Sequence, residues 1–503
     1  MKITRRDALK IAGALAAGGA RADVPQGLKI AKGKYDGSRE SLKAWQAPEW
    51  FRDAKLGFWA HWGPQSAPEQ GDWYARNMYI QDSRQYKYHV ATYGHPSKFG
   101  FKDVVPTWKG DRFDPEHLIS LYKRAGAKYF VSMGVHHDNF DLWNSKHTRW
   151  NAAKMGPKKD IVGMWAKAAR NAGLKFGVSE HLWISYKWFA VSHLSDKTGP
   201  MAGVSYDGVD AANADLYHEA AVKAIGEKFS WDDQLIPDSW KRHWFARIQD
   251  LVDSYHPDLL YTDGGMPFEN YGSSLVSHLY NKVPDAVYNS KTREDCAGGT
   301  CILDVERGVV DRIWPDPWQT DTCVGNWHYQ RDVKYKSPKT VIDMLCDIVS
   351  RNGNLLLNFP LPNSGEPDAQ ELKIVDEITK WMAVNSEGIY STRPWKTYGE
   401  GGETIASGDS KFNESKRKDM TAQDVRFTAK GSTVYAYVMG WPEKEAVIRA
   451  LGMKSEQAPG KVTNVELLGH GKVDFKQEDA GLHVTMPQEK PGDFAFGLKI
   501  YRS

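Results

Sequence analysis

A repeated alternation of short apolar runs with segments of helical periodicity constrains the fold of this chain more than any other feature. The apolar runs have the length and composition of β-strands, and they lie at 56–63, 128–138, 174–181, 258–265, 285–290 and 354–360. Helical periodicity fills the intervening segments, chiefly 116–127, 160–173, 243–257, 274–283, 339–353 and 368–385. Strands that alternate with crossover helices pair in parallel. Repeats of this number in about 350 residues predict an α/β catalytic domain, 23–390, built as a (β/α)8-like (TIM) barrel rather than an open doubly wound sheet.

The pattern changes after residue 390. Short alternating runs, such as RFTAKGSTVYAYV at 426–438 and VTNVELLGHG at 462–471, are separated by Gly, Pro and charged turns. No long helical pattern remains, which predicts a C-terminal antiparallel β-sandwich over 391–503. The simplest role for this domain is to support the barrel, and the alternative is independent glycan binding.

The first 22 residues have the features of an export signal. Arg5 and Arg6 are followed by a weakly apolar Ala/Gly-rich stretch and by the small-x-small sequence Ala20-Arg21-Ala22. This order predicts a twin-arginine-type signal peptide, 1–22, and a periplasmic or secreted protein; a basic tail is the alternative. Because the apolar stretch is too short to span a bilayer, no membrane insertion of the mature chain is expected.

Charge and cysteine content exclude several classes of partner. The formal net charge is +3, and residues 1–22 carry five basic residues and one acidic residue, so the rest of the chain is near −1. Such a balance argues against nucleic acid or an anionic membrane as partner. The four cysteines contain no CxxC pair, so no structural zinc site is expected. A disulfide between Cys296 and Cys301 and four free thiols both remain open.

Barrel enzymes carry their functional side chains at the C-terminal ends of the strands. The expected strand ends provide His61, His136, His137, Asp138, Glu180, His181, Asp263 and Asn358. Consecutive strand residues point to opposite faces, so His136 and His137 cannot both face one ion while the strand continues. The chain also lacks an HExxH spacing, a P-loop and a GxGxxG after an early strand. We therefore expect no metal and no other cofactor.

A neutral ligand rich in hydroxyl groups remains. The chain has 20 Trp, 23 Tyr and 18 Phe, which suits either packed cores or stacking on sugar rings. Glycoside hydrolysis commonly requires two carboxyl groups, and Asp263 is the natural first, although Asp-Gly-Gly is also a good turn sequence. Candidates for the second lie in the loop-rich segment 296–329: Asp304, Glu306, Asp311, Asp316 and Asp321.

Four segments in the same order resemble the α-L-fucosidases of glycoside hydrolase family 29. They are WFRDAKLGFWAHWGPQS at 50–66, HHDNFDLWNSKHTRWNA at 136–152, PWQTDTCVGNWHY at 317–329 and NGNLLLNFP at 352–360. The resemblance implies a (β/α)8-like barrel followed by a β-sandwich. It also implies a retaining exo-α-L-fucosidase that acts through a covalent fucosyl-enzyme intermediate, without a metal. The substrate would be a fucosylated oligosaccharide or glycoconjugate.

The resemblance assigns roles to particular residues. Asp263 matches the nucleophile, and Glu306 lies where the family places its acid/base. His61, His136, His137 and Trp73 match ligands of the sugar.

This chain departs from the family pattern around those residues. Thr262 stands where Asn or Phe is common, and Asp72 stands where a Glu often precedes the Trp. Ser179 lies where some members have a Tyr, and Lys291 lies where some have an Arg. Gln319 replaces a frequent Glu. Asp72, Ser179 and Lys291 are therefore candidate substrate contacts, and these departures bear on linkage preference.

Further expectations concern residues to which the resemblance assigns no role, and they take the 6-deoxy sugar from the resemblance. Met266 and Phe268, just after Asp263, could supply the apolar wall that the methyl group of a 6-deoxy sugar requires. Trp314, Trp318 and Trp327 are expected to pack at the barrel rim, or else to line the site of the leaving sugar. The alternatives for function are a retaining hydrolase of a related sugar, such as an α-galactoside, and a non-catalytic glycan-binding protein.

Overall fold

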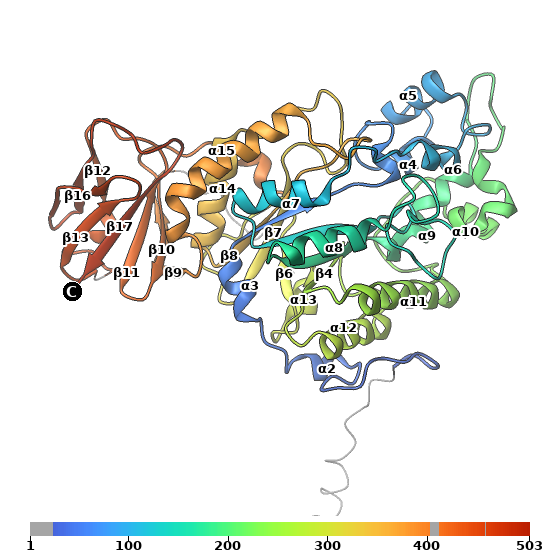
Figure 1. The fold of residues 1–503 in the computed structure, drawn as a ribbon. Coiled ribbons are helices and arrows are strands. Elements are labelled where there is room, and N and C mark those ends of the chain that lie inside the picture. Colours follow the sequence, from blue (N-terminus) through green and yellow to red (C-terminus); the bar gives the residue numbers. More distant parts are fainter. Residues whose placement is uncertain (1–23, 403–411, 458) are drawn as a thin grey trace, which may run out of the picture.

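The computed structural model describes residues 24–402, 412–457 and 459–503. The expected signal peptide, 1–22, lies outside the described residues. Eight parallel strands close into a barrel in the order β1 to β8 (Figure 1), which confirms the predicted fold class. These strands are β1 Leu56–Ala60, β2 Tyr129–Val135, β3 Lys175–Glu180, β4 Leu259–Thr262, β5 Val287–Ser290, β6 Ile302–Asp304, β7 Trp318–Cys323 and β8 Gly353–Asn358.

Long helices cover most of the barrel. They are α7 Pro115–Arg124, α8 Ile161–Asn171, α11 Asp238–Tyr255, α12 Asn270–Lys282, α14 Pro338–Ser350 and α15 Ala369–Asn385. Only the one-turn helix α13, Arg293–Cys296, lies between β5 and β6, and no helix lies between β6 and β7. Shorter helices lie before β1 and in the connections after β1 and β3: α2 Arg39–Leu42, α3 Glu49–Ala54, α4 Tyr74–Asn77, α5 Arg84–Tyr93, α6 Phe101–Val104, α9 Ser185–Trp188 and α10 Ala214–Tyr217.

Local sequence explains where the main helices begin and end. The Asp160 side chain caps α8 by accepting from the backbone N–H of Gly163. Asp368 and Glu371 form a capping box at the start of α15. Helix α11 ends where His256 adopts a left-handed conformation immediately before Pro257, which cannot continue a helix.

Two strands lie in the segment that the sequence indicated as loop-rich. Strand β6 has three residues, and β7 has the polar sequence Trp-Gln-Thr-Asp-Thr-Cys, yet both are fully buried. Their hydrophobic pattern is weak because polar side chains of β7, including Gln319 and Asp321, point into a polar part of the barrel interior.

The C-terminal domain is antiparallel throughout, as predicted. One sheet has the order β14-β13-β17-β11-β10-β9 and the other the order β12-β16-β15. Their strands are β9 Arg393–Glu400, β10 Val425–Lys430, β11 Thr433–Val438, β12 Glu445–Ile448, β13 Val462–Leu467, β14 Gly471–Lys472, β15 Phe475–Gln477, β16 Leu482–Thr485 and β17 Phe496–Arg502. Inward-facing residues of both sheets, such as Phe427, Val465 and Leu482, form one apolar core.

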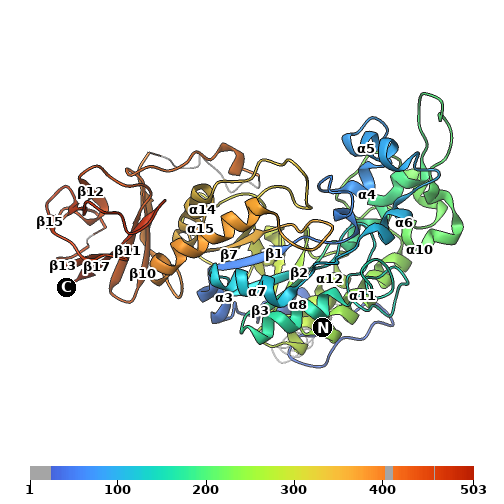
Figure 2. The same ribbon diagram turned by 45° about the horizontal axis from the view of Figure 1, so that its top comes forward.

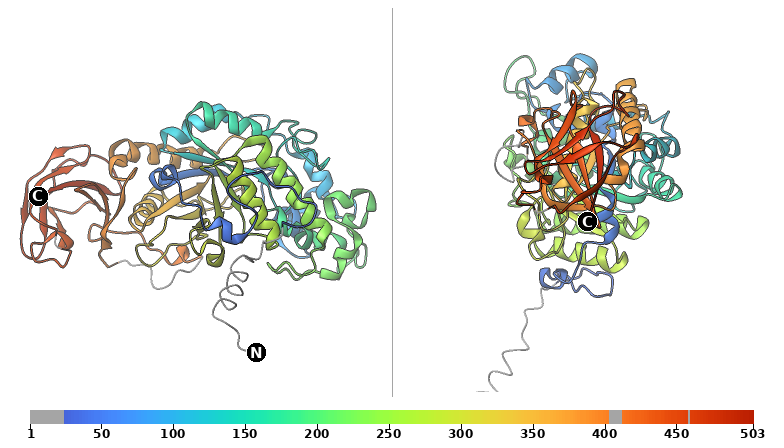
Figure 3. Two further views of the ribbon diagram at one scale, coloured as in Figure 1. Left: turned by 90° about the horizontal axis from the view of Figure 1, so that it is seen from below. Right: turned by 90° about the vertical axis from the view of Figure 1, so that its left-hand side faces the viewer.

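The two domains meet along α14 and α15. Figure 2 shows these helices between the barrel strands and β10, and Figure 3 shows the C-terminal strands at one end of an elongated molecule. The buried carboxylate of Asp347 in α14 is central to the joint. It bonds Arg351, the residue that follows α14, and also Arg417 and Arg426 of the C-terminal domain.

Two further features bear on the sequence analysis. A disulfide joins Cys296 to Cys301, whereas Cys323 and Cys346 are buried free thiols. Over the described residues, no helix has both the length and the apolar character needed to cross a membrane.

Candidate active site

A regular pattern of positions brings the polar residues of the site together. The first residue after each of β1 to β5 is, in order, His61, His136, His181, Asp263 and Lys291. Glu306 follows β6 by two residues. All six line one cavity of about 590 Å³. The carboxyl ends of the strands therefore form the floor of the site, as in other parallel barrels.

Asp263 is held at the turn that ends β4. Its backbone N–H donates to the Glu180 carbonyl at 3.1 Å, and its own carbonyl accepts from Trp183 Nε1 at 2.7 Å. Gly264 then adopts φ of +118°, and a Cβ atom there would lie 3.0 Å from the Trp183 ring. The glycine is needed for this conformation and this close approach. Asp263 is thus both the first residue of a turn and a side chain that points into the cavity.

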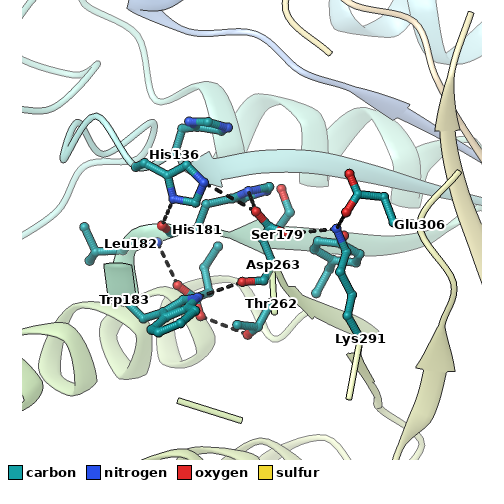
Figure 4. Close-up of polar contacts among 12 residues, drawn as sticks. His136, Ser179, His181, Leu182, Trp183, Thr262, Asp263, Lys291 and Glu306 are labelled. Atoms are coloured by element: carbon teal, nitrogen blue, oxygen red, sulfur yellow. Dashed lines mark hydrogen bonds and ion pairs between the residues drawn. The ribbon is translucent and has the colours of Figure 1, made fainter. Parts of the chain in front are cut away.

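Lys291 lies between the two carboxylates that the resemblance assigned to catalysis (Figure 4). Its Nζ donates to Asp263 Oδ1 at 2.7 Å and to Glu306 Oε2 at 2.6 Å. Distances of 2.7 Å and 2.6 Å to one nitrogen leave the two bonded oxygens no more than about 5.3 Å apart. One ammonium group therefore limits how far apart the two carboxyl groups lie.

The environment separates the pKa values of these carboxyl groups. Burial acts to raise the pKa of Asp263, but Lys291 and the histidines 137 and 181 outweigh it and hold this pKa well below its usual range. Burial, helped by the charges of Asp321 and Asp263, raises the pKa of Glu306 to about 7 in spite of Lys291. At neutral pH one carboxyl is ionised, and the other retains a proton in a large part of the molecules.

Lys291 itself remains a cation. Burial alone would lower its pKa, but the carboxylates of Asp263, Asp321 and Glu306 raise that pKa well above its usual value.

The competing acids occupy other environments. Asp304 is buried beside Gln319, which donates to it, and burial raises its pKa well above the usual value. Asp321 lines the cavity floor and accepts from the Tyr261 hydroxyl at 2.8 Å. Asp311 pairs with its neighbour Arg312, and Asp316 is exposed beside a different pocket. The geometry favours Glu306 as the partner of Asp263.

Four histidines line or adjoin the cavity, and in two of them a hydrogen-bond partner identifies one donor nitrogen. His61 Nδ1 lies 3.1 Å from Asn358 Oδ1, which can only accept, so the other ring nitrogen of a neutral ring is an acceptor. His137 Nδ1 donates to the His181 carbonyl at 2.6 Å, and its Nε2 lies 3.4 Å from Asp263 Oδ2. Burial lowers the pKa of His61 and His136 far below the usual value and that of His181 to about 4. These neutral rings are suited to hydrogen bonds with hydroxyl groups.

The alternation expected for His136 and His137 applied only while the strand continued, and the strand ends before them. Strand β2 ends at Val135, so both histidines lie beyond the strand, where side chains no longer alternate. Ring nitrogens of His136, His137 and His181 lie within 4.8 Å of one another, as do donor atoms of Asp72, His136 and His328. Either group could hold a metal ion, although Asp72 already accepts from His328 Nδ1 at 2.6 Å.

Aromatic side chains form the walls. Trp73, next to Asp72, contacts the His137 ring edge-on at a centroid distance of 6.0 Å and lines the cavity. Trp327, one of the three tryptophans in question, also lines it and packs against His61. By contrast, Trp318 is buried with its Nε1 bonded to the Arg351 carbonyl, and Trp314 lines another pocket.

Three expected contacts lie away from the cavity. Ser179 is fully buried in β3, where its hydroxyl faces Met133 Sδ at 3.4 Å, because the strand turns this side chain away from the cavity. The Gly264–Gly265 turn carries the chain back into the core, so Met266 is 6% exposed and Phe268 packs on Trp244. The expected apolar wall after Asp263 is therefore wrong for both residues.

Several lining residues were given no role in sugar binding from the sequence. His181 was identified only as a residue at a strand end, because the four matching segments do not include it. Trp183, Trp231 and Phe412 lie in segments without strand or helix periodicity, and only the tertiary fold brings them to the cavity.

The fold and the site together define the class of enzyme to which this protein belongs. A closed parallel barrel presents an ionised and a protonated carboxyl group across a cavity of neutral histidines and aromatic walls, which is the apparatus of a glycoside hydrolase.

Comparisons with known proteins agree with this class and refine it. The family model for alpha-L-fucosidase matches residues 24–387, and the model for the alpha-L-fucosidase C-terminal domain matches residues 417–501. This chain belongs to the α-L-fucosidase family.

Curated relatives are similar over nearly their whole length. The rat tissue alpha-L-fucosidase is 28% identical, with 94% of this chain and 93% of that protein covered. The human plasma alpha-L-fucosidase is 27% identical, with 90% and 89% covered. Among solved structures, a Thermotoga maritima alpha-fucosidase superimposes with a TM-score of 0.71 at 25% identity, covering 93% of this chain and all of that one. Another structure of the Thermotoga maritima enzyme, solved in complex with fucose, has the same TM-score at 24% identity and covers 92% and 99% of the two chains.

Proposed function

We propose that this chain is a retaining exo-α-L-fucosidase that removes terminal α-L-fucosyl residues from oligosaccharides or glycoconjugates. Asp263 attacks the anomeric carbon and forms a covalent fucosyl-enzyme intermediate, while Glu306 protonates the leaving oxygen. Glu306 then takes a proton from water, which releases fucose with its original anomeric configuration. The solved relative bound to fucose supports the choice of sugar.

The observation that carries this proposal is the pair of carboxyl groups on Lys291. Retaining glycosidases keep these groups about 5–5.5 Å apart, whereas inverting enzymes keep them farther apart to leave room for a water molecule between the general base and the sugar. Asp263 and Glu306 can be no farther apart than about 5.3 Å at the oxygens that Lys291 bonds. Their opposite pKa shifts supply one nucleophile and one acid.

Lys291 has a further role in this scheme. Before the first step Asp263 is ionised and Glu306 is protonated; in the intermediate Asp263 is a neutral ester and Glu306 is the carboxylate. One negative charge faces the ammonium group in both states. Because Lys291 contacts both groups, it stabilises the charge in either position without moving.

The remaining side chains are arranged to bind the sugar. Neutral His61 and His136 present ring nitrogens to the hydroxyl groups, and Asp72 accepts from further hydroxyls. His137 does not line the cavity; it lies behind Asp263 with Nε2 3.4 Å from Asp263 Oδ2. Trp73 provides an apolar face for the ring or its methyl group.

Two measurements test the proposal. Proton NMR of the first sugar released from an aryl α-L-fucoside should show the α-anomer. Asp263→Asn should reduce kcat by at least ~10³-fold, whereas Asp376→Asn, at an exposed ion pair on α15, should leave it unchanged. Release of the β-anomer, or near-normal turnover by Asp263→Asn, would exclude the mechanism. Faster turnover of an aryl α-galactoside would instead assign the related-sugar alternative.

We also propose export of the mature enzyme to the periplasm or beyond through the twin-arginine pathway. The arginine pair and the small-x-small site support it. Replacing Arg5 and Arg6 by lysine should retain the uncleaved protein in the cytoplasm; unchanged processing after residue 22 would contradict export by this route.

A further inference from the structure

Two aromatic side chains at the cavity are unusually exposed. Trp231 has 48% of its surface exposed and Phe412 has 57%. Over the described parts of the chain, no other Trp, Phe or Tyr is exposed to this degree. Both line the cavity that contains Asp263 and Glu306. Ligand cavities are lined mainly by apolar and aromatic side chains, so two exposed aromatic rings at one cavity are suited to contact a ligand.

The Trp231 ring is braced by other aromatic rings. It contacts Phe229 edge-on at 5.0 Å, Trp73 at 6.1 Å and Trp183 at 6.3 Å between centroids. Trp73 and Trp183 line the inner cavity, so Trp231 continues that wall outward.

Phe412 comes from the C-terminal domain, in the connection between β9 and β10. Its backbone N–H donates to the Glu306 carbonyl at 2.8 Å. The next residue, Asn413, is 2% exposed and makes two hydrogen bonds of 3.1 Å with the backbone of Val309. Phe412 itself has φ of +59°, a conformation that costs energy for an aromatic residue and persists only where neighbours hold it. The backbone that carries this ring is therefore held beside Glu306.

We propose that Trp231 and Phe412 form the subsite for the leaving sugar and select a saccharide over a small leaving group. This inference rests on the proposed fucosidase function. The cavity volume, about 590 Å³, lies within the range of pockets that bind drug-sized ligands. A pocket of this size has room for more than one deoxyhexose. Glu306 must lie next to the leaving oxygen, and Phe412 is anchored to Glu306, so the sugar attached to that oxygen meets the Phe412 ring. The apolar face of a pyranose covers such rings, and its hydroxyl groups remain in water.

The test compares two substrates that share the fucosyl group. A fucosyl disaccharide needs both the acid and the leaving-sugar subsite; α-L-fucosyl fluoride has no leaving sugar and needs neither. For Phe412→Ala and for Trp231→Ala, we expect the ratio of kcat/KM for the disaccharide to kcat/KM for the fluoride to fall about ten-fold or more. The loss should appear mainly in KM for the disaccharide.

Conservative and remote variants serve as controls. Phe412→Tyr and Trp231→Phe keep an aromatic face. In these variants the ratio of kcat/KM for the disaccharide to kcat/KM for the fluoride should be close to the wild-type ratio. Val447→Ala removes an exposed apolar side chain of β12 and should not change it. The pH at which activity on the disaccharide falls on the basic side should stay at the wild-type value in Phe412→Ala.

Two results would overturn the proposal. An unchanged substrate ratio in both alanine variants would show that the rings bind no leaving sugar. A fall in kcat together with a shifted basic limb in Phe412→Ala would show that the residue acts only by holding Glu306. Failure of the fucosidase function is distinct, because the wild-type enzyme would then hydrolyse neither substrate.

Discussion

At the residue scale, chemistry depends on a lysine shared by two carboxyl groups. Lys291 stands where the family resemblance led us to expect an arginine in some members. Lysine offers a compact charge on a flexible stem, whereas arginine presents a planar fork. Here that charge contacts Asp263, Glu306 and, at 3.7 Å, Asp321. The pKa values of both proposed catalytic groups therefore depend on one side chain.

The wild-type pH profile follows from those pKa values. The proposed mechanism requires Asp263 ionised and Glu306 protonated, so kcat/KM should fall on the basic side near pH 7, where Glu306 loses its proton. On the acidic side it should fall only well below the usual carboxylate range, where Asp263 becomes protonated. Glu306→Ala should lose the basic limb and regain turnover of an activated aryl fucoside when azide is added. If the fall in kcat/KM on the basic side persists in Glu306→Ala, a different residue is the general acid.

Removing the shared charge should move both limbs in one direction. A nearby cation favours the ionised form of a carboxyl group, so its loss raises the pKa of Asp263 and of Glu306. In Lys291→Met, both limbs of the profile should shift to higher pH, and kcat/KM should fall roughly 10²-fold. Lys291→Arg keeps the charge and should keep both limbs near their wild-type positions. Limbs that stay in place in Lys291→Met would show that Lys291 does not set these pKa values.

Some site residues could be predicted from the sequence, and others could not. Asp263 was identified because an apolar run ends in Asp-Gly-Gly, and His61 because another run ends in it. Ser179 and Met266 were wrong as contacts because a side chain's direction depends on strand register and turn geometry, which a motif does not reveal. Phe412 lies more than a hundred residues from Glu306 in the chain, so no local pattern could join them.

At the element scale, the connection between β9 and β10 joins the C-terminal domain to the catalytic loop. Glu414 is the main anchor. Its carboxylate accepts from Arg307, Lys336 and Thr322, and its backbone N–H donates to the Arg307 carbonyl at 3.0 Å. Arg307 directly follows Glu306, so this anchor helps to fix the acid/base.

Loss of the anchor should affect stability and catalysis together. In Glu414→Ala two cations and a hydroxyl lose their acceptor, which should cost about 2 kcal/mol of unfolding free energy. Hydrolysis of an unactivated fucoside should slow more than hydrolysis of fucosyl fluoride, since only the former needs Glu306 as acid. Thermal unfolding and the two rates measure both effects. Glu478→Ala, at an exposed pair in the same domain, is the control; equal behaviour of the two variants would argue against an anchoring role.

At the scale of the whole molecule, the barrel and sandwich form one unit around Asp347. Three arginines from two domains surround this carboxylate, and together they hold its pKa well below the usual range against the effect of burial. Tyr398 of β9 covers the same cluster, with the Arg351 guanidinium 3.8 Å from its ring centroid. Removing one member of a buried ion cluster leaves the others uncompensated.

Asp347→Ala should therefore destabilise the protein strongly. We expect a loss of about 3–5 kcal/mol, measured by thermal or denaturant unfolding. Asp376→Ala, which removes an ion pair exposed on α15, should cost less than about 1 kcal/mol. Similar unfolding midpoints for the two variants would show that the cluster does not hold the domains together.

The architecture was easier to predict than its details. Six of the eight barrel strands have apolar runs flanked by helical periodicity, which identified the barrel. Strands β6 and β7 were not predicted because β6 has only three residues and β7 has a polar sequence. The ion cluster around Asp347 was not predicted because its arginines come together only when the two domains pack against each other.

The central claim is that Asp263 forms a covalent bond with fucose, and trapping that intermediate tests it most directly. The enzyme should be inactivated with a 2-deoxy-2-fluoro-α-L-fucosyl fluoride analogue of its substrate, digested and mapped by mass spectrometry. The account predicts one added fluorofucosyl group on the peptide that contains Asp263, localised to that residue by fragmentation, and none in Asp263→Asn. A label on Glu306, Asp321 or any other side chain, or complete turnover with no adduct and an inverted product, would contradict it.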